Sequence, residues 1–170
     1  MMLLQVGEVD HESEEDADAA EEARALALLE IQVWLELDLL LRTLAALRGP
    51  ANKSPVPSQL LGLLPPPPEG GWPARFDFGS LAEQLKERYD GAIAEGEIGQ
   101  IALTNYVPVD HEIYPARRRA QRLSYAVWAV IGGNGVELQP LLDESSTAER
   151  LRLALRRMRD VMKQLGMASD

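Results

Sequence analysis

The sequence predicts a mainly α-helical protein, a helical bundle of one long helix plus shorter helices with a proline-rich loop. Two observations favour this class: leucines at three- and four-residue spacing over residues 15–48, and a second such stripe behind a capping pattern at 146–149. With 170 residues, of which 46% are hydrophobic, the chain has room for one ordinary domain with a core.

The long helix is expected over residues 15–48. Its apolar positions fall on one helix face and are Leu26, Leu29, Val33, Leu37, Leu40, Leu44 and Leu47. Ser13 or an acid near it is expected to cap the start, and Gly49 with Pro50 to end the helix. Such a helix reaches about 50 Å, whereas a last helix of about 20 residues covers about 30 Å. Some leucines are therefore expected to lie bare or to meet a partner.

Residues 1–14 form an acidic head that is expected to be disordered, with a remnant strand at 2–9 as the alternative. The first 22 residues contain a cluster of carboxylates and no Lys or Arg, which is typical of a solvated segment.

Residues 49–79 are expected to form a proline-rich loop without regular structure, because prolines recur throughout them between glycines and serines. The four prolines 65–68 favour a stiff polyproline II segment. This segment is interpreted as a connector or exposed loop, with docking into an aromatic-lined groove as the alternative.

Residues 80–166 are expected to form a helical subdomain. A capping box at Ser80 and Glu83 predicts a short helix to about Tyr89. Residues 98–109 have no clear period and fit either an irregular segment or a short strand. For residues 117–131 we choose a helix over a strand that turns into a hairpin at 136–138, because Leu123, Val127 and Val130 share one helix face.

The stretch 141–166 predicts a short helix, a capped turn and a long amphipathic helix. Ser146 and Glu149 form a second capping box, and Gly166 is the expected C-cap. The apolar stripe consists of Leu151, Leu155, Met158, Met162 and Leu165. The opposite side is expected to be basic through Arg150, Arg152, Arg156, Arg157, Arg159 and Lys163, which could pair with the acidic head. Among the tryptophans, Trp128 is expected to be the most buried.

No metal site, cofactor or catalytic site is expected. The chain has no cysteine, and His11 lies far from His111 in sequence. Three adjacent residues such as Asp110, His111 and Glu112 cannot all face one ion. Residues 132–135 are rich in glycine but are not followed by the Lys-Ser or Lys-Thr of a phosphate loop, so they are interpreted as a turn.

The net charge of −10 argues against nucleic acid as a partner, because phosphate binding needs a basic surface. The longest apolar stretch, 31–47, is interrupted by Glu36, Asp38 and Arg42, so no membrane span is expected. The absence of cysteine suits an intracellular protein, and no targeting peptide is visible.

Taken with residues 119–130, the stretch 141–166 resembles the C-terminal helical half of the Lon N-terminal domain, the substrate-binding module of Lon proteases. The resemblance is carried by leucines, an acidic turn and an Arg-Leu pair that opens the final helix, here Leu141, Leu142, Asp143, Arg150 and Leu151. The order of long helix, variable loop and later helices is also similar to that of stand-alone Lon-domain proteins of plants and algae.

The resemblance implies substrate binding rather than catalysis. Family members carry a β-barrel half before the long helix, and no matching strand series is visible here. That half is therefore expected to be missing, through a late start of the reading frame or a shortened isoform. Family analogy makes the chloroplast a candidate location. Lon proteases cut with a serine and a lysine, but Ser145 and Ser146 are better explained as cap residues.

The resulting hypothesis is a non-enzymatic, partial Lon-domain-like module that binds a protein partner or unfolded polypeptide and is linked to protein quality control. The alternative is a structural or oligomerisation module in which the long helix pairs with a second copy, forming a homo-oligomer. The residues expected to contact protein are Leu37, Leu40, Leu44, Arg117, Arg118 and Arg119.

Overall fold

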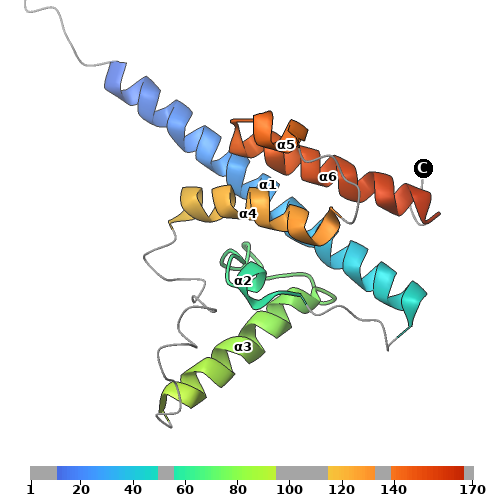
Figure 1. Ribbon diagram of the computed structural model, residues 1–170. Coiled ribbons are helices and arrows are strands. Elements are labelled where there is room, and N and C mark those ends of the chain that lie inside the picture. The colour runs from blue at the N-terminus through green and yellow to red at the C-terminus, as the bar shows by residue number, and fades with distance from the viewer. Residues whose placement is uncertain (1–10, 50–55, 95–114, 133–138, 167–170) are drawn as a thin grey trace, which may run out of the picture.

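The computed structural model describes residues 11–49, 56–94, 115–132 and 139–166. Regular structure in these ranges is entirely helical, which confirms the predicted fold class (Figure 1). The helices are α1 (His11–Arg48), α2 (Ser58–Leu61), α3 (Asp77–Ala94), α4 (Ala116–Ile131), α5 (Gln139–Asp143) and α6 (Thr147–Gln164).

Helix α1 is the predicted long helix, but it begins four residues before the expected start at residue 15. Residues 11–14, assigned to the head, are helical. Gly49 follows the helix with a φ of +78°, a left-handed conformation that ends it as predicted. The expected remnant strand at 2–9 lies outside the described residues.

Helices α1, α4 and α6 pack together and bury their apolar faces in one core (Figure 1). The predicted stripes meet in this core, where Leu37 of α1, Leu123 of α4 and Leu151 of α6 are each completely buried. The choice of a helix over a strand for residues 117–131 is confirmed by α4. The alternative hairpin at 136–138 and the undecided segment 98–109 lie outside the described residues.

The proline-rich stretch is not the exposed connector that its composition predicts. It contains α2, and much of its apolar content is buried, namely Leu60, Leu61, Leu63, Leu64, Phe76 and Phe78. Aromatic rings link the stretch to α1, because Trp34 meets Phe78 edge to face at 5.9 Å between ring centroids. Proline removes a backbone donor but does not prevent the side chains next to it from packing. The prediction of an exposed loop therefore failed for these leucines and phenylalanines.

Helix α3 spans more residues than the capping pattern at Ser80 predicts, and Ser80 lies inside it. The first residue of α3 is Asp77, whose backbone N–H donates to Asp38 Oδ1 of α1 at 3.3 Å. A carboxylate accepting at a helix start satisfies one of the unpaired donors there. Because this acceptor lies 39 residues away, a local sequence pattern could not reveal it.

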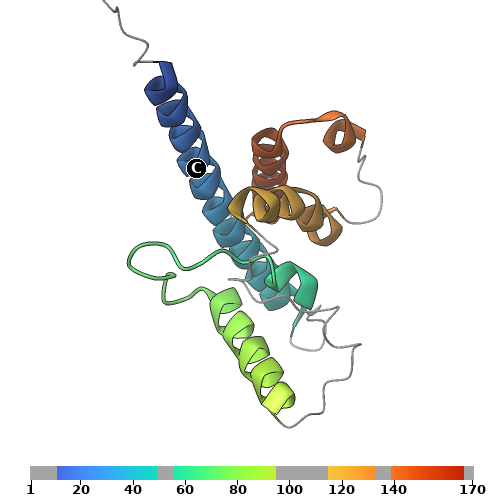
Figure 2. The ribbon, with the colours of Figure 1, turned by 90° about the vertical axis from the view of Figure 1, so that its left-hand side faces the viewer.

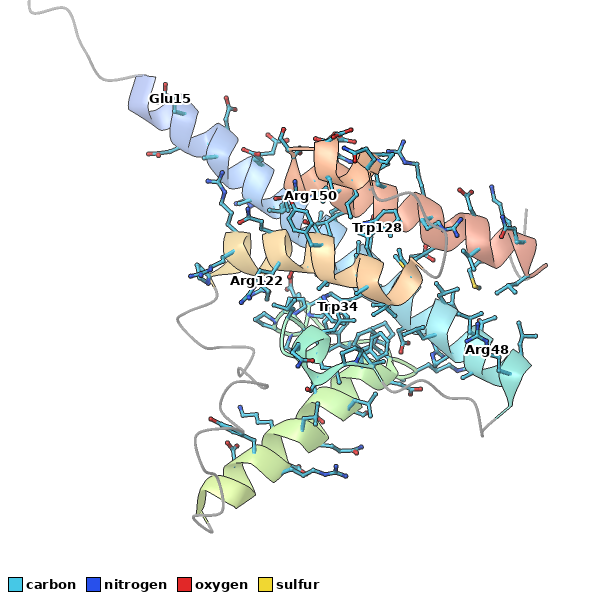
Figure 3. All side chains as sticks on the ribbon, viewed as in Figure 1. Glu15, Trp34, Arg48, Arg122, Trp128 and Arg150 are labelled. Carbon is cyan, nitrogen blue, oxygen red and sulfur yellow. The ribbon has the colours of Figure 1, made fainter. Side chains whose placement is uncertain are left out.

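The most buried tryptophan is Trp34 at 0% exposure, and the prediction of Trp128 was wrong, since Trp128 is only half-buried. Trp34 lies where α1 is covered by α4 and α6 on one side and by the α2–α3 segment on the other (Figure 3). The central turns of α1 are therefore apolar on more than one face, as expected of a helix buried on several sides.

Helix α6 begins and ends as predicted. The Ser146 hydroxyl accepts from the backbone N–H of Glu149 at 3.4 Å, and Gly166 adopts a φ of +69° after the last turn. The return bond of the capping box is replaced, because the backbone N–H of Ser146 donates to the Glu144 carboxylate at 2.8 Å. The predicted stripe from Leu151 to Met162 is buried.

Candidate protein-docking cleft

The first turn of α4 is fixed on α1 by a buried ion pair. Arg119 Nε donates to Glu30 Oε1 at 2.8 Å, and a second guanidinium nitrogen donates to Oε2 at 3.3 Å. Arg119 was expected to contact a protein partner, but its side chain is buried here by this internal pairing. Arg117 and Arg118 remain exposed on the same turn.

The start of α6 is held by Arg150. Its guanidinium donates to the backbone carbonyls of Glu144 and Ser145 at 2.6 and 2.9 Å and to Thr147 Oγ1 at 3.0 Å. It also lies over the Tyr125 ring of α4, 4.4 Å from the ring centroid, between α4 and α6 (Figure 3). Arg150 is 2% exposed, so its assignment to the basic outer side of α6 was wrong. This internal arginine fixes the α5–α6 turn beside α4.

Near the Arg119–Glu30 pair and Arg150 lies a hollow of about 680 Å³, which we call the Arg117 cleft. One wall is α1, with Leu26 and Leu29 half-buried and Glu22 exposed at the rim. The opposite wall is polar and basic, formed by Arg117 and Gln121 of α4 and by residues 145–148 and Arg152. An apolar wall facing a cationic wall suits a segment that is apolar on one side and acidic on the other.

On the N-terminal side of the cleft, α1 continues as an exposed helix. Figures 1 and 2 both show the N-terminal turns of α1 standing clear of the other helices. All side chains of residues 15–25 are exposed, and we call this stretch the acidic arm. A smaller hollow of about 200 Å³ lies where the arm meets α4, lined by Ala19, Ala23 and Leu26 on α1 and by Arg117. None of the predicted stripe leucines lies in the arm; the bare leucine of that stripe is Leu47 at the other end of α1, which is 58% exposed.

The expected contact residues of α1 do not belong to this surface. Leu37 and Leu40 are buried in the core, because α4, α6 and the α2–α3 segment cover the middle of α1 within the same chain. Leu44 is half-buried and lines a separate hollow of about 160 Å³ with Val56 and Phe78. Of the six expected residues, only Arg117 lines the Arg117 cleft, with Arg118 exposed beside it. Sequence reasoning missed Arg152, Leu26 and Leu29 as cleft residues.

Two buried carboxyl groups, those of Glu30 and Asp38, have raised pKa values. Burial raises the pKa of Glu30, although the hydrogen bond and the charge of Arg119 act in the opposite direction. Burial likewise raises the pKa of Asp38, opposed by Arg42, which donates to Asp38 Oδ2 at 3.0 Å, and by the backbone N–H of Asp77. Both groups have structural partners that account for their positions.

Within the described ranges, no group of three or more His, Asp or Glu side chains is arranged to hold a metal ion. Residues 110–112, considered above as a metal site, lie outside these ranges. None of the described helices combines the length and the apolar character that crossing a membrane requires.

Comparison with protein families, curated proteins and solved structures gives no match for this chain. The resemblance to the Lon N-terminal domain therefore stays a prediction based on the motif at 141–151.

Proposed function

We propose that this chain is a non-enzymatic protein-binding module whose docking site is the Arg117 cleft. The observation that carries this proposal is the pairing of an apolar wall, Leu26 and Leu29, with a basic wall, Arg117 and Arg152, around one hollow. A partner suited to both walls is an amphipathic helix with an acidic side, because apolar burial supplies affinity and opposite charge fixes the orientation.

The resemblance to the Lon N-terminal domain gives this role its cellular setting. A module of that kind serves protein quality control by holding an unfolded or partly folded polypeptide that exposes such a segment. The chain would then deliver or retain clients without cutting them.

Fluorescence anisotropy with synthetic peptides tests the proposal. The probe is a helical peptide of about 20 residues with leucines on one face and glutamates on the other. Controls are a scrambled peptide of equal composition and a peptide with lysine in place of glutamate. We expect the acidic amphipathic peptide to bind best, and the variant Arg117→Glu/Arg152→Glu to bind it at least about tenfold more weakly. Equal binding of all three peptides, or no effect of the double substitution, contradicts the proposal.

A structural or oligomerisation module is the second candidate, and the outer side of α1 favours it. Leu28 and Leu39 are 64% and 44% exposed. They lie eleven residues apart, close to three full helical turns, and therefore point the same way. Pairing through this side would differ from the predicted use of Leu37 and Leu40, which the chain itself covers.

A further inference from the structure

The acidic arm and the Arg117 cleft are complementary surfaces of one molecule, and only the end of the arm, at Glu22 and Ala25, reaches the cleft of its own chain. The arm carries exposed carboxylates at positions 15, 16, 18, 21 and 22, and its first cation is Arg24. The cleft presents Arg117 and Arg152, of which Arg152 also pairs with Glu149 on the same helix face. Arm and cleft wall are successive parts of the single helix α1, and the arm points away from the bundle (Figure 2). The arm therefore cannot fold back into its own cleft.

The arm also carries an apolar stripe that continues the core-facing side of α1. Within the arm this stripe consists of Ala19 and Ala23, which lie four residues apart and above Leu26 of the cleft wall, on the side that turns inward at Val33 and Leu37. Farther along, α4 and α6 cover this side, but along the arm Ala19 and Ala23 stay exposed, with only the start of α4 beside them. The arm thus has the acidic, amphipathic character that the cleft requires.

The start of α4 gives an independent electrostatic reason for an acidic partner. Arg117, Arg118 and Arg119 occupy its first turn, which contains no acidic residue and has no side-chain cap. Positive side chains at the positive end of a helix dipole are unfavourable. Glu30 neutralises Arg119, whereas Arg117 and Arg118 stay exposed. A carboxylate brought to this turn would relieve the repulsion.

We infer that a second copy of this chain docks its acidic arm in the Arg117 cleft, forming a two-fold dimer with antiparallel α1 helices. The inference rests on the proposed docking role of the cleft. Two-fold symmetry makes the contact reciprocal, so each arm fills the other copy's cleft. With the axis near Glu22, residue 15 of one copy lies beside residue 29 of the other, and residue 18 beside residue 26. Glu15 and Asp18 of one copy then approach Arg117 and Arg152 of the other.

Light scattering coupled to size-exclusion chromatography of the full chain tests the dimer. We expect the molar mass of two chains at about 50 μM in low salt, and dissociation at about 0.5 M salt, where charge attraction between exposed groups is screened. Glu22→Gln is expected to strengthen the dimer, because the two Glu22 carboxylates approach each other near the axis. A monomer at all concentrations up to about 100 μM overturns the inference.

A charge exchange identifies the contact. Arg117→Glu/Arg152→Glu in one protein and Glu15→Lys/Asp18→Lys in another should each weaken self-association at least about tenfold. Mixed one to one, the two variants should form a heterodimer, because both contacts then join opposite charges again. All four side chains are exposed, and circular dichroism checks that helix content is unchanged. A mixture that stays monomeric overturns the inference.

Two further results separate this inference from the proposed function and from pairing through the outer side of α1. Loss of the dimer in Leu28→Glu/Leu39→Glu but not in Arg117→Glu/Arg152→Glu assigns the interface to the outer side and overturns the inference. If the chain is monomeric but still binds the acidic amphipathic peptide, the proposed function holds. In that case a second copy is excluded as the occupant of the Arg117 cleft. A monomer that binds no peptide removes both.

Discussion

Arg150 Nε of α6 donates to Ser124 Oγ of α4 at 2.9 Å, deep in the packed interface between the two helices. The Ser124 hydroxyl in turn donates to the backbone carbonyl of Gln121 at 2.7 Å. Both side chains are buried, and a buried polar group left without a partner is costly. This chain of hydrogen bonds therefore fixes how α6 sits along α4, in an interface that is otherwise apolar.

Replacement of this arginine by lysine should be destabilising although the charge is kept. Lysine cannot reproduce the planar fork that serves Ser124, Thr147 and the two carbonyls at once. We expect Arg150→Lys to lower the free energy of unfolding by about 1.5–3 kcal/mol. Urea denaturation followed by circular dichroism measures this loss. The matched control is Arg156→Lys on the exposed side of α6, which should change stability by less than about 0.5 kcal/mol.

The Arg119–Glu30 pair predicts a strongly non-additive pair of substitutions. Arg119→Met leaves the Glu30 carboxylate buried without its partner and should cost about 3–5 kcal/mol. Replacing both residues by methionine removes the uncompensated charge, so the double variant should be more stable than Arg119→Met alone. Urea denaturation of the two variants and the parent protein measures this difference. Equal or lower stability of the double variant would show that packing, not charge compensation, gives this contact its importance.

The raised pKa of Glu30 predicts that stability declines as the solution becomes less acidic. Below the ordinary value of 4.5 the carboxyl is protonated in both the folded and the unfolded chain. As the pH rises from there through the raised folded pKa, the unfolded chain releases its proton first, so the free energy of unfolding falls. Glu30→Gln should flatten this decline in urea denaturation at a series of pH values.

The control for this pH dependence is Glu83→Gln, because Glu83 is exposed on α3. The stability of the Glu83→Gln variant should change with pH in the same way as the stability of the parent protein. A Glu30→Gln variant with an unchanged slope would show that general charge repulsion in this acidic chain, rather than the buried carboxyl, sets the decline.

The helices that sequence reasoning predicted well are those whose local pattern agrees with their packing. In α6 the capping serine, the stripe from Leu151 to Met162 and Gly166 all act within one helix, so a local pattern contains the information. The misassigned residues depend on distant partners. Arg119 and Arg150 look like surface charges until Glu30 and Ser124 are brought to them by the fold.

The same reason explains what was missed at the candidate site. Arg117 was among the residues expected to contact protein, but Arg152 enters the cleft only because α6 starts beside α4. Leu26 and Leu29 were correctly placed on the inner side of α1, yet periodicity alone does not show where the covering helices end. The boundary between the covered and the bare part of α1 is a property of the tertiary structure.

The N-cap of α6 provides a test with a neighbouring control. The Ser146 hydroxyl accepts from the Glu149 backbone N–H, whereas the contact of Ser145 with Arg150 is made through its backbone carbonyl. Ser146→Ala should lower the free energy of unfolding by about 0.5–2 kcal/mol, and Ser145→Ala should have little effect. Thermal unfolding followed at 222 nm reports both. A larger loss for Ser145→Ala would show that its hydroxyl, not that of Ser146, supports the start of the helix.

The stability of the three-helix core should depend more on a buried leucine of α6 than on an exposed leucine. Leu151 is completely buried between α1 and α4, and a leucine-to-alanine change at such a position typically costs about 2–5 kcal/mol through lost burial and the cavity left behind. Leu142 precedes it on α5 and is 64% exposed. We therefore expect Leu151→Ala to lower the midpoint of urea denaturation strongly and Leu142→Ala to leave it nearly unchanged. A similar fall of the denaturation midpoint in both variants would mean that a partner covers α5 in solution. Light scattering of the Leu142→Ala variant would then show whether that partner is a second copy.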